Sequence, residues 1–155
     1  MADRKAFHLA VSVGLFLCLS SPSTAQAVGG GPAPAPVAPR SAEAEYNKGL
    51  QAKAARRYSD AANDFRRAVD IRPNYPEAWN ELGFALRNSG QYAEALRAYE
   101  QALRLRPNYP EALEYLGEAY VRLGRLDEAQ AILERLKPLD MLRAQDLEGA
   151  IRAGR

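Results

Sequence analysis

The stretch Arg72-Pro-Asn-Tyr-Pro-Glu-Ala78 decides the fold, because the same residues return 34 positions later as Arg106-Pro-Asn-Tyr-Pro-Glu-Ala112. A fixed step of this length predicts a chain built from stacked copies of one small unit. Other positions keep the same step across three copies: Gly49, Gly83 and Gly117; Ala61, Ala95 and Ala129; Phe65, Tyr99 and Leu133; Ile71, Leu105 and Leu139.

Each copy has the pattern of two amphipathic helices. In the second half of the middle copy, apolar residues fall near i, i+3, i+4, i+7, i+10 and i+11, which is a helical stripe and not the alternation of a strand. The first helix of this copy is expected to carry Trp79, Leu82, Phe84 and Leu86, and the second Tyr92, Ala95, Leu96, Tyr99, Ala102, Leu103 and Leu105.

Proline and glycine mark the ends of these helices. Pro76 and Pro110 suit the first turn of a helix, where the missing backbone N–H costs no hydrogen bond. Gly90 and Gly124 stand where the first helix of a copy must stop, which predicts a left-handed cap.

Small residues predict that the two helices of a copy pack closely. Gly83 on the first helix and Ala95 on the second let the backbones approach, and large side chains such as Trp79 and Tyr99 fill the space beside them. A single helix pair cannot bury its apolar surface, whereas stacked pairs can.

The middle copy resembles a unit of the tetratricopeptide repeat (TPR) family, because it reads Trp79-x-x-Leu82-Gly83-x-x-Leu86, followed by Tyr92, Ala95, Tyr99, Ala102 and Pro107. The third copy resembles the same unit through Leu113, Leu116, Gly117, Tyr120, Gly124, Ala129 and Leu133. The first copy is weaker, with Glu45 in the place of Trp79 and Lys48 in that of Leu82. A terminal repeat is expected to differ in this way, since its outer face meets water.

This resemblance implies an all-α fold, a right-handed α-solenoid of three TPR helix-turn-helix units at 42–75, 76–109 and 110–143. In the third copy Pro138 comes early, so a break and a C-terminal capping helix over 140–153 are expected. The side chains expected to cover the end of the stack are Met141, Leu142, Leu147 and Ile151.

Residues 1–27 have the pattern of a secretory signal peptide, a positive start followed by a mostly apolar run over 7–19. The run is too short for a transmembrane helix, which needs roughly 20 apolar residues. Small residues at 25–27 predict cleavage after Ala27; the alternative is an uncleaved anchor. Lipidation of Cys18 is disfavoured, because the large Leu17 precedes it.

Residues 28–41 are rich in glycine, proline and alanine and have almost nothing to bury, which predicts a disordered linker. The style of the signal, with no cysteine and no Asn-x-Ser/Thr glycosylation acceptor after residue 27, predicts a bacterial protein of the periplasm or one that is secreted. A eukaryotic secretory origin is the less favoured alternative.

The composition argues against an enzyme. Cleavage would remove Cys18 and His8, the only cysteine and histidine, which excludes Cys/His zinc sites and Cys–His or Ser–His nucleophiles. The nearly balanced charge gives no basic stripe for nucleic acid. We therefore expect no catalytic residue, no cofactor, no metal, no nucleic-acid partner and no membrane span after cleavage.

The resemblance places the first helix of each unit along a concave groove that binds a peptide segment or a partner helix. Apolar side chains along it suit an extended segment or a helix, and its glutamates favour a basic or amide-rich ligand. The glutamates could instead hold a hard cation or act as acid and base, but a peptide-facing surface is favoured. The expected groove residues are Tyr46, Leu50, Lys53, Glu77, Asn80, Phe84, Arg87, Asn88, Glu111, Glu114, Glu118, Val121 and Arg122.

One subclass of the family clamps the carboxylate tails of chaperones with Lys, Asn and Arg on these helices. The matching positions here carry Tyr46, Leu50, Glu81, Glu111 and Tyr115, none of them a cation, so this binding is not expected. The function expected from the sequence is a protein-interaction adaptor of the bacterial periplasm or cell envelope. The alternative is a self-associating structural module of an envelope complex.

Overall fold

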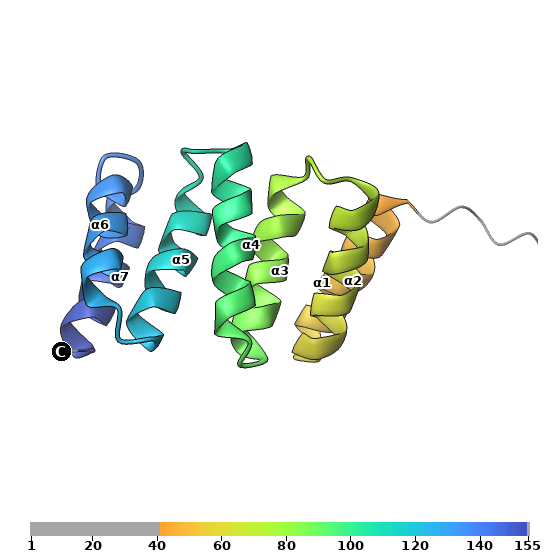
Figure 1. The fold of residues 1–155 in the computed structure, drawn as a ribbon, viewed down its shortest axis with the longest axis horizontal. Coiled ribbons are helices and arrows are strands. Elements are labelled where there is room, and N and C mark those ends of the chain that lie inside the picture. Colours follow the sequence, from red (N-terminus) through yellow and green to blue (C-terminus); the bar gives the residue numbers. More distant parts are fainter. Residues whose placement is uncertain (1–40, 155) are drawn as a thin grey trace, which may run out of the picture. The chain divides into compact units, whose positions relative to one another are not determined.

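The structure is a computed structural model that describes residues 41–154. Within this part of the chain there are seven α-helices and no strand, and the helices form a row of packed pairs (Figure 1). The predicted signal peptide and linker, apart from Ser41, lie outside the described residues. None of the helices described is long and apolar enough to cross a membrane. The helices are α1 (Ala42–Ala54), α2 (Tyr58–Ile71), α3 (Pro76–Asn88), α4 (Tyr92–Leu105), α5 (Pro110–Arg122), α6 (Leu126–Leu136) and α7 (Met141–Ala153).

The 34-residue step of the sequence is also the step of the helices, since α1, α3 and α5 begin at Ala42, Pro76 and Pro110. Each helix packs against the next one along the chain, and α3 also contacts α5. The second helix of the third unit departs from the step, because α6 ends at Leu136, two residues before Pro138. The structure confirms the all-α fold.

The turns inside the units use a left-handed residue, as predicted. Gly90 and Gly124 have φ angles of 84° and 70°. The corresponding place in the first unit is taken by Arg56, with a φ of 57°. A side chain with a Cβ adopts this conformation only at a cost, so the first unit carries local strain that the other two avoid.

Close packing between the helices of a unit is confirmed at the repeated glycines. A Cβ placed on Gly83 would lie 2.6 Å from the ring of Tyr99, a fully buried side chain of α4. Gly49 has the same relation to Phe65 of α2. In the third unit the neighbour of Gly117 is Leu147 of α7, so the last helix fills the place that an aromatic ring of the second helix fills elsewhere.

Helix α7 packs on α5 and α6 through a stripe of Ala144, Leu147 and Ile151, all buried. The expectation that Met141 and Leu142 also cover the end of the stack is wrong, because they are 61% and 70% exposed. Leu142 lies off the buried stripe, and Met141 lies in the first turn, which the neighbouring helices leave open to solvent.

The first unit differs from expectation at Glu45, which does not face water. Its side chain is 2% exposed, and its carboxylate accepts hydrogen bonds from Lys48 Nζ and from Arg67 Nε of α2, both at 2.9 Å. These bonds, from Lys48 first and Arg67 second, lower the pKa of Glu45 below its ordinary value. An ion-paired carboxylate thus occupies the position that Trp79 holds in the second unit.

Candidate functional site

Helices α1, α3 and α5 form one surface, which we call the first-helix face. Side chains join the three helices directly across it. Lys53 Nζ of α1 lies 2.6 Å from Glu81 Oε2 of α3, and Arg87 of α3 pairs with Glu118 of α5. The first helices of the three units therefore present a continuous surface.

Phe84 lies at the centre of a row of aromatic rings on this face. Its ring centroid is 5.3 Å from that of Tyr115 in α5 and 6.2 Å from that of Tyr58, the first residue of α2. Two cations also approach it, Lys53 Nζ at 5.0 Å from the centroid and the Arg87 guanidinium at 5.5 Å. Cation–π contacts of this kind hold long, flexible side chains against the rings.

Tyr46 of α1 belongs to a second group of aromatic rings, with Phe65 and Tyr75. Its ring centroid lies 5.1 Å from that of Tyr75, in the segment before α3, and 5.6 Å from that of Phe65. Burial, and after it the nearby Glu81, raise the pKa of Tyr46 to about 12. The phenol therefore stays protonated and can donate a hydrogen bond over the physiological pH range.

The structure brings five of the expected groove residues together at the carboxyl ends of α3 and α5. They line a surface hollow of about 440 Å³, and Gly90, Tyr92 and Ala150 are the other residues of its lining. The five are Arg87, Asn88, Glu118, Val121 and Arg122.

The structure does not leave two of the expected groove residues at the surface. Asn80 is fully buried, and neither polar atom of its amide has a hydrogen-bond partner among the described residues. Glu114 is buried and pairs with Arg143 of α7. A ligand on the surface cannot reach Asn80 without moving the side chains that cover it.

The expected acidic run on α5 is divided among separate partners. Glu114 pairs with Arg143, and Glu118 pairs with Arg87. Glu111 accepts hydrogen bonds from the hydroxyls of Tyr109, at 3.4 Å, and of Tyr115, at 3.3 Å. Two of the three charges are therefore compensated within the chain, so the run is not a uniform acidic surface.

Two glutamates of this face have pKa values above the ordinary value: Glu81, which pairs with α1, and Glu114, which pairs with α7. Burial is the main cause for both, and the ion pairs with Lys53 and Arg143 oppose it only in part. No group of three or more acidic or thiol and imidazole side chains within residues 41–154 is placed to hold a metal ion.

Sequence reasoning missed Tyr75 and Tyr109 as residues of this site, and it considered Tyr115 only as a clamp position. The signal was present in the repeated motif, because Tyr75 and Tyr109 are its tyrosines. Arg72 stacks on Tyr75 with 4.6 Å between guanidinium carbon and ring centroid, and Arg106 stacks on Tyr109 at 4.7 Å.

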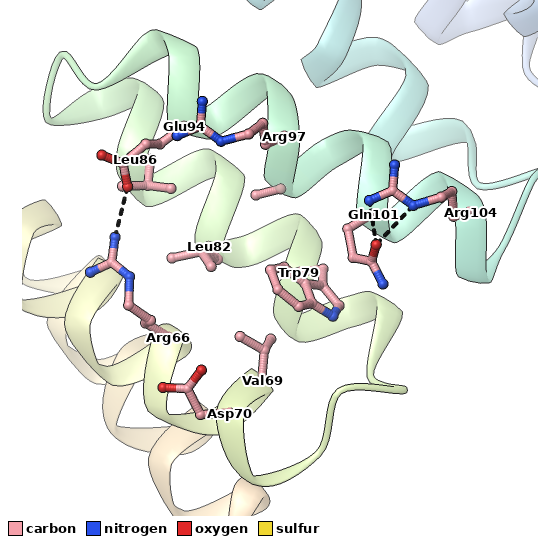
Figure 2. Close-up of a pocket in the computed structure, with 11 residues that line it drawn as sticks. Arg66, Val69, Asp70, Trp79, Leu82, Leu86, Glu94, Arg97, Gln101 and Arg104 are labelled. Atoms are coloured by element: carbon pink, nitrogen blue, oxygen red, sulfur yellow. Dashed lines mark hydrogen bonds and ion pairs between the residues drawn. The ribbon is translucent and has the colours of Figure 1, made fainter.

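A second hollow, of about 390 Å³, lies between α2, α3 and α4, away from the aromatic row (Figure 2). Val69, Trp79 and Leu82 give it an apolar lining, and the indole N–H of Trp79 donates to the Pro73 carbonyl at 2.8 Å. Arg66 and Glu94 form an ion pair across it at 3.1 Å. Both of these side chains are more than 40% exposed, so the pair contributes little to stability.

Two family models, each described as tetratricopeptide repeat, match the sequence at residues 86–151 and 65–97. No curated protein matches the chain at a significant level. Many solved structures match the chain. Those described below are less than 25% identical to it, so they show a shared fold and not a shared function.

Three solved structures illustrate this likeness of fold. The second TPR domain of human RPAP3, in complex with an HSP70 peptide, is 23% identical over 72% of this chain and 94% of its own, with a TM-score of 0.68. The TPR2B domain of yeast Sti1, in complex with Hsp70, is 16% identical over 74% and 98%, with a TM-score of 0.70. The Yersinia enterocolitica type III secretion chaperone SycD, in complex with a peptide of the translocator YopD, is 20% identical over 72% and 92%, with a TM-score of 0.66. The chain therefore carries tetratricopeptide repeats, and its residues 41–154 have the all-α fold of that family.

Proposed function

We propose that this protein is an interaction adaptor that holds a peptide segment or a partner helix on its first-helix face. The observation that carries the proposal is that α1, α3 and α5 each present a partly buried aromatic ring, Tyr46, Phe84 and Tyr115, of which the last two are in contact. Partly exposed rings next to fixed charges supply both the apolar contact and the orientation that peptide recognition needs.

Similar structures support this reading. The RPAP3 domain and SycD were both solved with a peptide bound.

The ligand we propose is not the carboxylate tail of a chaperone. Lys53 and Arg87 are cations on the first-helix face, but Glu81 and Glu118 already neutralise them. A free carboxylate would have to displace these internal partners, at an energetic cost that an unpaired cation would not impose.

The setting we propose is the bacterial periplasm or cell envelope, reached after cleavage behind Ala27. The sequence of residues 1–27 supports this part of the proposal. Amino-terminal sequencing of the protein exported by a bacterial host should begin at Val28. A chain that still begins at Met1 would favour a retained anchor, and one found only in the cytoplasm would contradict export.

Affinity capture from an envelope extract tests the function. The bait proteins are the unmodified chain, Phe84→Ala and Leu50→Ala, with Arg97→Ala as the control, because Arg97 is exposed and lines the hollow on the α2–α4 side. A partner should be recovered by the unmodified chain and the control and lost with the two first-helix variants. Equal recovery by all four proteins would count against the first-helix face.

Self-association is the second candidate function, and exposed apolar side chains at the start of α7 favour it. Leu139, Met141 and Leu142 are 38%, 61% and 70% exposed, and they follow one another closely in the chain. Sedimentation at micromolar concentration should show a dimer that Leu142→Asp dissociates. A monomer at all concentrations would exclude this candidate.

A further inference from the structure

The repeated motif builds the same three-residue contact twice, and we call each contact a rung. In the first rung, Arg72 pairs with Glu43, from the first turn of α1, and stacks on Tyr75. In the second rung, Arg106 pairs with Glu77 of α3 and stacks on Tyr109. In both rungs the arginine follows its glutamate by 29 positions, so the rungs repeat with the helices.

The third rung has its glutamate, Glu111, but neither its arginine nor its tyrosine. The residue 29 positions after Glu111 is Asp140, and Arg143 stands where the other two rungs have a tyrosine. The Asp140 carboxylate caps α7 by accepting from Arg143 N at 3.1 Å, and it pairs with Arg143 Nε at 3.3 Å. The Arg143 guanidinium also binds Glu114. No cationic side chain of residues 41–154 forms an ion pair with Glu111, although Arg143 lies near enough for Glu111, after Glu114, to raise its pKa.

The surroundings of Glu111 suit a cation from outside the chain. The hydroxyls of Tyr109 and Tyr115 donate to its two carboxylate oxygens at 3.4 Å and 3.3 Å, long hydrogen bonds that leave the carboxylate at the hydroxyl edges of the two rings. Burial, and after it Glu111, raises the pKa of both phenols, so they remain neutral donors and do not add a competing charge. A carboxylate offers a guanidinium an ion pair, and the face of a neighbouring tyrosine ring offers it a stacking surface.

We propose that Glu111, with Tyr109 and Tyr115, is a subsite for one arginine side chain of the peptide that lies on the first-helix face. The inference rests on the proposed function, since it places that peptide's charge in the open third rung. Arginine is chosen over lysine because the two complete rungs of this chain both use it. Its flat guanidinium can pair and stack at once, whereas an ammonium is a point charge.

Two labelled heptapeptides test the subsite by fluorescence anisotropy. One has a single central arginine among alanines, and the other has citrulline, the uncharged isostere, in the same place. The unmodified chain should bind the arginine peptide about tenfold more tightly, the scale of one charge-assisted hydrogen-bonded contact. Glu111→Gln should remove this difference.

Arg106→Gln is the matched variant. It opens the second rung, because Glu77 loses its partner while Tyr109 remains, and the ion pair that it removes is exposed and contributes little to stability. This variant should bind a second equivalent of the arginine peptide, and NMR shifts of the Glu77 amide should report it.

The outcomes separate the subsite from the function on which it rests. The subsite is overturned if the two peptides bind equally, if the arginine advantage survives Glu111→Gln, or if the arginine peptide does not bind at millimolar concentration. If both peptides bind equally and Phe84→Ala weakens both, the first-helix face binds peptides but selects no arginine. If neither binds while a captured partner still requires Phe84, the function stands and the subsite fails.

Discussion

The arginine, tyrosine and proline of the repeated motif each have a structural role that explains why they recur. Arg106 reaches back to Glu77 in the preceding first helix and stacks on Tyr109. Pro110 begins α5, where its missing N–H would have had no partner in the helix. Ala112, the last residue of the motif, is fully buried. The motif thus sets a helix start and a link between neighbouring units at once.

Gly83 is required by its distance from Tyr99, which gives the first prediction. Gly83→Ala should lower the free energy of unfolding by about 1–3 kcal/mol, because its Cβ would lie 2.6 Å from the ring. Urea denaturation measures the change. The control is Gly149→Ala on α7, where no atom lies within 4 Å; it should raise stability by about 0.5–1 kcal/mol. A stable Gly83→Ala protein would contradict the close packing.

The second prediction concerns Arg56, where a substitution should increase stability instead of lowering it. It holds a left-handed conformation that Gly90 and Gly124 adopt in the other units. Arg56→Gly should raise the free energy of unfolding by about 1 kcal/mol, because glycine carries no Cβ penalty there. Thermal and urea unfolding should both show the gain. A loss of stability would mean that the exposed arginine makes a stabilising contact that outweighs its strain.

At the scale of helices, the sequence was sufficient to predict all seven with their order, including the capping helix expected over 140–153. Proline at 76 and 110 and glycine at 90 and 124 fix the ends, and the apolar stripe fixes which side is buried. In the seventh helix the burial of Leu147 and Ile151 was expected, but the contact of Leu147 with Gly117 was not. Leu147 takes the place beside Gly117, and no spacing in the sequence links these two residues because they belong to different patterns.

Helix α7 should be held mainly by Leu147, which is fully buried beside Gly117. Leu147→Ala should lower the free energy of unfolding by about 2–5 kcal/mol, the range for removing a buried leucine. Amide exchange in α7 should accelerate first. Leu142→Ala serves as the control, because Leu142 is 70% exposed and its loss should change stability by less than about 0.5 kcal/mol. Equal effects of the two variants would contradict the packing of α7.

Glu45 joins α1 to α2 and makes that contact sensitive to pH. Lys48 and Arg67 lower the pKa of Glu45 in the folded chain. Its ionised form is therefore favoured by folding, so its stabilising effect is complete above the ordinary pKa of 4.5 and is lost as the pH falls through the lower folded value. Glu45→Gln should be less stable than the unmodified chain at neutral pH. The urea midpoints of the two proteins should become equal as the pH is lowered. A difference between the midpoints that does not change with pH would contradict a role of the Glu45 ion pairs in stability.

At the scale of the molecule, the sequence was sufficient to predict which helices form the first-helix face. It was not sufficient to predict which charged side chains pair across that face. Periodicity places residues on a helix, and family resemblance names the helices of the groove. It does not say which charges meet across neighbouring helices. Lys53–Glu81 and Arg87–Glu118 join different units, and Asn80, which was expected in the groove, is fully buried.

Hydrogen exchange of the chain bound to its captured partner tests the central claim most directly, namely that a partner lies across α1, α3 and α5. Slower amide exchange is predicted at the exposed ends of these three helices and in the segments around Tyr75 and Tyr109, with little change in α2 and α4. Protection concentrated on α2 and α4, around the hollow lined by Val69 and Arg97, would contradict it.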